Sequence, residues 1–169
     1  MNDAPHKPGQ HMAAESAVAM DVFLAAAARE VSGDVAAHDL ECLKAIYTIA
    51  RGSSDAAANI LSYEAMRELG VPVTSLPPSI FSLGNGVRVQ DSVALVISQS
   101  GASDDLVLSA KGITSQGAKV VAITNQPDSP VEQTSNVTIP IAAGPEHAVP
   151  ATKTVVGAIG AGAALLAAL

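Results

Sequence analysis

The stretch that decides the fold reads Val93-Ala94-Leu95-Val96-Ile97-Ser98-Gln99-Ser100-Gly101-Ala102-Ser103-Asp104-Asp105. Its continuous apolar run is typical of a buried parallel strand, and the hydroxyls and glycine after it indicate a loop before a helix. Such a loop lies at the carboxyl edge of a sheet, where backbone amides and the positive end of the next helix face an anion. The stretch therefore predicts an α/β protein with an anion pocket.

A second loop of the same kind follows an earlier apolar run and reads Ala50-Arg51-Gly52-Ser53-Ser54-Asp55. Along the chain, short apolar runs alternate with helical patterns, which indicates a parallel sheet covered on both faces. The predicted strands cover residues 45–50, 71–75, 92–98, 119–124 and 137–141. The predicted helices cover residues 11–31, ending near Ser32-Gly33, then 39–44, 54–69, 104–116 and a long segment after Pro150.

We expect a three-layer αβα sandwich with a five-stranded parallel sheet in the flavodoxin-like order 2-1-3-4-5. In that order the direction of winding reverses between the first and third strands, and ligands bind in the crevice at this point. Those two strands carry the serine loops. Topology and loop chemistry thus predict the same site.

The composition indicates one domain with a sizeable core, since the chain has 169 residues of which 49% are hydrophobic. We expect a flexible tail over residues 1–10 and a single domain over 11–169. Sixteen acidic residues against nine basic ones give a net charge of -7, without a basic cluster. Nucleic acid is therefore not an expected partner.

The chain also lacks the usual marks of secretion and of membrane insertion. Its N-terminus has no apolar signal segment, and the single Cys42 cannot form an intramolecular disulfide, so we predict a cytoplasmic protein. The uncharged run over 154–169 falls short of the ~20 residues of a spanning helix. Its alanine and glycine content favours a closely packed helix, and no membrane association is expected.

Each serine loop has a plain structural alternative. Ser103 could cap its helix, and Ser53 or Ser54 could cap the helix over 54–69. The aspartates at both helix starts count against a nearby phosphate unless they turn toward solvent. Arg51 is either solvated or neutralises a ligand phosphate. Neither a G-x-x-x-x-G-K-[ST] segment nor a dinucleotide fingerprint is present.

A third loop concentrates ionisable groups between a strand and the final helix. It reads Gly144-Pro145-Glu146-His147-Ala148-Val149-Pro150-Ala151-Thr152-Lys153. Glu146 could move a proton and His147 could assist a carbonyl or ring oxygen, the roles that sugar isomerisation needs. Alternatively the charged groups are only solvated and Thr152 caps the helix. No spacing suggests a metal site, and no cofactor is expected.

The three loops, in this order and spacing, resemble those of the sugar isomerase (SIS) domain family over about residues 12–169. The chain looks most like the first of the two tandem domains in the isomerase part of glucosamine-6-phosphate synthase and in SIS-type glucosamine-6-phosphate deaminases. The resemblance implies phosphate contacts from Ser54, Ser98, Gln99, Ser100 and Ser103. It implies sugar contacts from Gly52, Ser53, Val149 and Ala151, although Ala151 replaces a serine common in the relatives.

In the tandem relatives the proton-moving glutamate and the ring-opening histidine come from the second SIS domain or a neighbouring subunit, which this sequence does not include. The resemblance implies the phosphosugar-binding domain of an amino-sugar phosphate isomerase or deaminase, with fructose 6-phosphate or glucosamine 6-phosphate as the type of substrate and aldose–ketose proton transfer as the chemistry. Whether the chain by itself is an enzyme is left open.

Three alternatives stand beside this interpretation: a non-catalytic sugar-phosphate-binding regulatory module, a truncated fragment, and an α/β fragment without a ligand. We also expect a homodimer. It would form through the surface that meets the second domain in the relatives, and the small-residue final helix is consistent with it.

Overall fold

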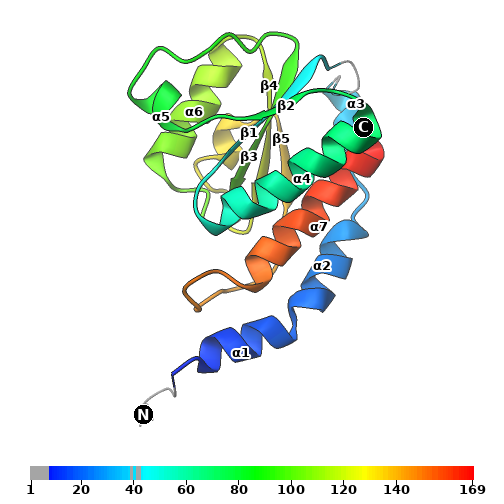
Figure 1. Ribbon diagram of the computed structural model, residues 1–169, viewed down its shortest axis with the longest axis vertical. Helices are drawn as coiled ribbons and strands as arrows, with labels where there is room; N and C mark the ends of the chain where they lie inside the picture. The colour runs from blue at the N-terminus through cyan, green and yellow to red at the C-terminus, as the bar shows by residue number, and fades with distance from the viewer. Residues whose placement is uncertain (1–7, 39, 41–42) are drawn as a thin grey trace.

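The computed structural model describes residues 8–38, 40 and 43–169, and in them five strands form one parallel sheet (Figure 1). The order is β2-β1-β3-β4-β5, as predicted. The strands are β1 (Ala45–Ala50), β2 (Val73–Ser75), β3 (Ser92–Ser98), β4 (Lys119–Thr124) and β5 (Val137–Pro140). The predicted α/β sandwich is confirmed, and the bounds of β1, β3 and β4 agree with the predicted ranges.

Helices cover both faces of the sheet. In Figure 1, α4 and α7 lie on one side with α2 against α7, and α5 and α6 lie on the other. The helices are α1 (Gln10–Ala17), α2 (Ala19–Ala27), α3 (Ser32–Ala37), α4 (Ser53–Leu69), α5 (Ser79–Ser82), α6 (Asp104–Ser115), the 3₁₀ turn η1 (Glu132–Thr134) and α7 (Lys153–Ala168).

The central strand β3 shows why its sequence is apolar throughout. Leu95 and Ile97 belong to the core beneath α4 and α7, whereas Ala94 and Val96 belong to the core beneath α6. Successive side chains of a strand point to opposite faces, so a strand covered on both faces has no polar alternation. The continuous run that predicted a parallel sheet is therefore explained by two separate cores.

Helix α7 is packed closely between α2 and α4, as its small residues predicted. A Cβ atom at Gly160 would lie 2.5 Å from the carbonyl oxygen of Phe23, and one at Gly157 would lie 2.7 Å from Ile141. A Cβ atom at Gly162 would overlap Leu61 of α4. These three glycines are thus covered within the chain, so they do not support the expected pairing with another copy.

The predicted single helix over residues 11–31 is wrong in its continuity. The helical segment breaks at Val18, which separates α1 from α2, and α2 ends at Ala27. A new helix, α3, begins at Ser32, where the sequence predicted an end, and the Glu30 carboxylate accepts a hydrogen bond from the Ser32 amide at 2.9 Å. The break lets α2 pack on α7 while α1 extends past the sheet (Figure 1).

Three further differences are local. The turn-rich stretch with Pro77 and Pro78 contains the short helix α5, whose start tolerates proline. The predicted short helix over 39–44 and Cys42 fall on a stretch in which only residues 40, 43 and 44 are described, and these three are not helical. In the described ranges, none of the helices has the length and apolar character needed to cross a bilayer.

Candidate functional site

The two serine loops meet at the carboxyl edge of the sheet. Strands β1 and β3 are neighbours in register, with Ala50 opposite Ile97, so the loops that follow them lie side by side. Between the loops is a cavity of about 380 Å³. It is lined by Arg51, Gly52, Ser54, Ile97, Ser98, Gln99, Ser100, Ser103 and Leu106.

The backbone of the β3–α6 loop is held by specific hydrogen bonds. The buried Ser98 hydroxyl oxygen accepts from the Gly101 amide at 3.0 Å, and the Gly101 carbonyl accepts from the Val131 amide at 2.9 Å. Gly101 has a φ of 60°, and a Cβ atom there would overlap the Ser129 hydroxyl. Only glycine combines this backbone conformation with this close approach, so Gly101 fixes the course of the loop whose neighbouring residues, Ser100 and Ser103, line the cavity.

The serine hydroxyls in the cavity are not used as helix caps. Gly52, and not a serine, is the N-cap residue of α4, and Ser103 is the N-cap residue of α6 without a side-chain capping bond. Among the described residues, the Ser54 and Ser103 hydroxyls make no hydrogen bond to the protein. In α4 the amides of Ser54 and Asp55 already donate to the carbonyls of Arg51 and Gly52, so the donors that the cavity offers an anion are chiefly these two hydroxyls.

Arg51 of the β1–α4 loop and Asp105 in the first turn of α6 form an ion pair. The Arg51 Nη1 atom lies 3.2 Å from one Asp105 carboxylate oxygen and 3.4 Å from the other. The Arg51 side chain is 63% exposed and that of Asp105 is 27% exposed. Asp105 does not line the cavity, whereas Arg51 does. The structure therefore places Arg51, which the sequence predicts to be either solvated or close to a ligand phosphate, at the wall of the cavity.

Three of the predicted sugar contacts do not line this cavity. Gly52 is among the lining residues, but Ser53, Val149 and Ala151 are not. Val149 is 92% exposed and lies beside a different hollow of about 260 Å³. Within one copy of the described chain, the serine loops and the third loop thus form separate hollows.

Glu146 is engaged in holding the start of α7. Its carboxylate accepts hydrogen bonds from the Thr152 and Thr154 amides, each at 3.0 Å, and from the hydroxyls of both threonines. Burial raises the pKa of Glu146, but these hydrogen bonds together outweigh it and leave the pKa lowered. A carboxylate stabilised in this way is a poor proton acceptor. Glu146 is neither merely solvated nor poised as a base, and it caps the helix in place of Thr152.

Glu15 is the residue that the sequence analysis missed. It is 7% exposed, and its carboxylate accepts from the His147 amide at 2.6 Å, from the Ala148 amide and from the Thr152 hydroxyl at 2.9 Å. The bond from the His147 amide is the main cause of its lowered pKa. The only signal in the sequence was an acidic residue on a helix otherwise rich in alanine. Its partners are more than 130 positions away, so only the fold reveals its role.

His147 lies with its ring near that of His11, at 5.5 Å between centroids, in the hollow beside α1. It is not near the serine loops. In the part of the chain that the structure describes, His, Cys, Asp and Glu side chains form no group of three or more that could hold a metal ion.

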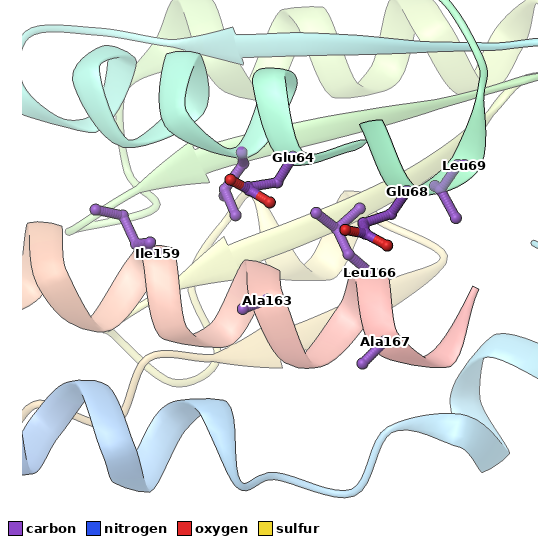
Figure 2. A pocket seen from close by; sticks show the side chains of 8 residues that line it. Glu64, Glu68, Leu69, Ile159, Ala163, Leu166 and Ala167 are labelled. Carbon is purple, nitrogen blue, oxygen red and sulfur yellow. The ribbon is translucent and has the colours of Figure 1, made fainter. Parts of the chain in front are cut away.

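A larger hollow of about 430 Å³ lies between the second half of α4 and α7. Figure 2 shows Glu64 and Glu68 of α4 reaching toward α7, above the small and aliphatic side chains of Ala163 and Leu166. These carboxylates would repel a phosphate, and the hollow is near the opposite end of α4 from Ser54. Its size therefore does not make it the anion site.

Several known proteins are similar to this chain in sequence and in architecture. The sequence pattern of the SIS domain family matches residues 39–168. A glutamine–fructose-6-phosphate aminotransferase (isomerizing) of Pyrobaculum aerophilum is 32% identical over 123 residues, which are 72% of this chain and 20% of that protein. The chain spans about a fifth of the length of the first curated relatives that it matches.

Solved structures with a similar fold are also known. A candidate phosphosugar isomerase from Silicibacter pomeroyi superposes with a TM-score of 0.86 at 39% identity, over 94% of this chain and 50% of that one. The NanR protein of Vibrio vulnificus, in complex with ManNAc-6P, superposes with a TM-score of 0.65 at 19% identity, over 94% of this chain and 60% of that one. The second likeness is one of fold alone.

Proposed function

Since this chain belongs to the SIS domain family, we propose that it binds a sugar phosphate and holds the phosphate between its two serine loops. The observation that carries the proposal is the cavity where unpartnered hydroxyls meet the starts of α4 and α6. Uncharged donors converging on one spot suit a phosphate. The proposed phosphate ligands are Ser54, Ser98, Gln99, Ser100 and Ser103.

The proposed ligand is a six-carbon sugar phosphate of the fructose 6-phosphate or glucosamine 6-phosphate type. Support comes from the names of the similar proteins, one an aminotransferase of fructose 6-phosphate and another solved with ManNAc-6P. Gly52 lines the same cavity and is a proposed sugar contact. Ser53, Val149 and Ala151 lie outside it, so their proposed sugar contacts would need a second domain or copy to complete the site.

We propose that the chain is the phosphosugar-binding part of an amino-sugar phosphate isomerase or deaminase, with the proton-transferring base supplied from elsewhere. The lowered pKa of Glu146 and its hydrogen bonds favour this division of labour. The same observation favours the second candidate, a non-catalytic binding module, because in neither candidate does Glu146 act as the base.

Calorimetric titration with glucosamine 6-phosphate, fructose 6-phosphate and unphosphorylated glucosamine tests the binding proposal. The phosphates are expected to bind and glucosamine to bind far more weakly. Isomerase and deaminase assays on the same sample separate the two candidates, since binding without turnover supports the binding module. Failure of every sugar phosphate to bind at millimolar concentration would overturn the proposal.

A homodimer remains part of the proposal, with its contact moved from α7 to the N-terminal helices. Four of the exposed large apolar side chains lie on α1, α2 and the break between them, at Met12, Val18, Met20 and Leu24. Exposed apolar groups of this kind are commonly covered by a partner. Light scattering at micromolar concentration should give twice the 16.9 kDa mass of the chain, and a monomer would contradict it.

A further inference from the structure

We propose that Arg51 is a further phosphate-binding residue and that Asp105 is the partner which the ligand phosphate replaces. This inference rests on the proposed function, because it adds a charged group to the same cavity. It also means that Arg51 favours the dianion of the ligand phosphate over the monoanion.

The position of the pair supports an exchange of partners. Arg51 comes from the loop between β1 and α4, and Asp105 comes from the first turn of α6, so the pair joins the elements that flank the cavity. Both contacts to Asp105 are made by one nitrogen, Nη1. A guanidinium carries five N–H donors in a planar fork, so donors on Nη2 and Nε remain for a second anion.

The charges around the cavity explain why the arginine is needed. Arg51 is the one charged side chain among the residues that line the cavity. Three aspartates stand in the first turns of the flanking helices: Asp55 in α4, and Asp104 and Asp105 in α6. Hydroxyls and amides accept either ionic form of a phosphate, but carboxylates nearby disfavour the dianion. A cation at the wall offsets that repulsion and favours the dianion.

The competing explanation is that the pair only ties one loop to α6. Exposed ion pairs contribute little to stability, and the Arg51 side chain is 63% exposed. The two explanations make opposite predictions for Asp105. If the carboxylate competes with the ligand for Arg51, its removal strengthens phosphate binding, whereas if it holds the loop in place, its removal weakens binding.

The test is calorimetric titration of glucosamine 6-phosphate into the wild-type chain and four variants. Arg51→Gln should weaken binding by about tenfold and Arg51→Lys by less, because lysine keeps the charge without the fork. Asp105→Asn should strengthen binding by about threefold. Arg67→Gln is the matched control, since Arg67 is an exposed arginine of α4 paired with Glu64 and Glu68 outside the cavity, and it should leave binding unchanged.

A pH series adds a readout that a merely structural role would not move. The second ionisation of a phosphate monoester has a pKa of about 6, so raising the pH through that value converts the ligand to its dianion. Wild-type affinity should rise over this range, and Arg51→Gln should lose most of the rise. Thermal melts of all variants show whether each is folded under the titration conditions.

The outcomes separate this inference from the function beneath it. If the wild type binds and Arg51→Gln binds equally well with the same pH dependence, the role of Arg51 is overturned while the proposed function stands. If Arg51→Gln and Asp105→Asn both weaken binding, the pair is a structural tie and the exchange is overturned. If the wild type binds no sugar phosphate, both the inference and the proposed function are overturned.

Discussion

The serine cavity and the third loop both gather polar groups at loops after strands, yet they differ in how those groups are satisfied. In the cavity, the hydroxyls of Ser54 and Ser103 make no hydrogen bond within the described chain. At the third loop, the carboxylates of Glu146 and of Glu15, which reaches the loop from α1, accept several hydrogen bonds each. Unsatisfied donors at a concave surface mark a place for a ligand, whereas saturated acceptors mark a support for the backbone.

The largest effect is expected from Gly101→Ala, which breaks the cavity side of this comparison. The new Cβ atom would overlap the Ser129 hydroxyl at a φ of 60°, so the loop must move. We expect sugar-phosphate binding to weaken by more than about tenfold and the free energy of unfolding to fall by about 1–3 kcal/mol. Calorimetry and urea unfolding measure the two effects.

Gly117→Ala is the matched control. Gly117 has a φ of 84°, but nothing lies within 4 Å of a Cβ atom there. It should lower stability through backbone strain alone and leave sugar-phosphate affinity unchanged. Equal losses of affinity in both variants would show that strain, and not the shape of the cavity wall, controls binding.

Glu146→Gln tests the third loop, where the carboxylate supports the backbone. It removes the charged acceptor at the start of α7, and we expect a loss of about 1–2 kcal/mol in the free energy of unfolding, as for the loss of a helix cap. Sugar-phosphate affinity should stay within about twofold of wild type. A large loss of affinity with unchanged stability would place Glu146 in the site after all.

Ser103→Ala should give the opposite pattern, a loss of affinity with little change in stability, and the effects should be smaller. The Ser103 hydroxyl makes no capping bond, so stability should change by less than about 0.5 kcal/mol. Binding of glucosamine 6-phosphate should weaken by about threefold to tenfold because one donor to the phosphate is lost. If the melting temperature falls and affinity holds, the serine is a cap and the comparison fails.

The smallest effect is expected from pH. The pKa of Glu15 and that of Glu146 are lowered in the folded chain, so both carboxylates stabilise the fold above the ordinary glutamate pKa. This stabilisation is lost as the pH falls below about 4.3 and toward the folded values. Urea unfolding at neutral and acidic pH should show the decline.

A Glu15→Gln, Glu146→Gln variant is the control for this pH dependence. It should be less stable than wild type at neutral pH and should lose less on acidification, because neither position can take up a proton. An equally steep decline in the variant would assign the pH dependence to other carboxylates.

Sequence reasoning was most successful where a signal lies within a few residues. The apolar runs of β1, β3 and β4 predicted their own bounds, because a strand buried on both faces needs no distant information. It failed over residues 11–31, where the alanine-rich pattern favours a helix everywhere. The break at Val18 depends on where α1 and α2 must pack, which the local pattern does not contain.

The candidate site shows the same division. The strand-loop-helix pattern predicted an anion pocket at the two serine loops, and the resemblance to the SIS family implied Ser98, Gln99, Ser100, Ser103 and Ser54 as its phosphate contacts. The pairing of Arg51 with Asp105 could not be predicted, because the direction of a long side chain depends on both loops at once. The hydrogen bonds of Glu146 to the start of α7 could not be predicted either, because they depend on how the loop folds back on α7.

The sequence by itself determined the layers and the serine loops, because the succession of strands and helices, strand burial and turn chemistry are local properties of the chain. The strand order was expected from the usual flavodoxin-like arrangement, and the strand pairing confirmed it. Only the tertiary structure decided which polar groups are free to meet a ligand. Whether a carboxylate or hydroxyl is already satisfied depends on partners such as Glu15 and His147, which are far apart in the chain and meet only when it is folded.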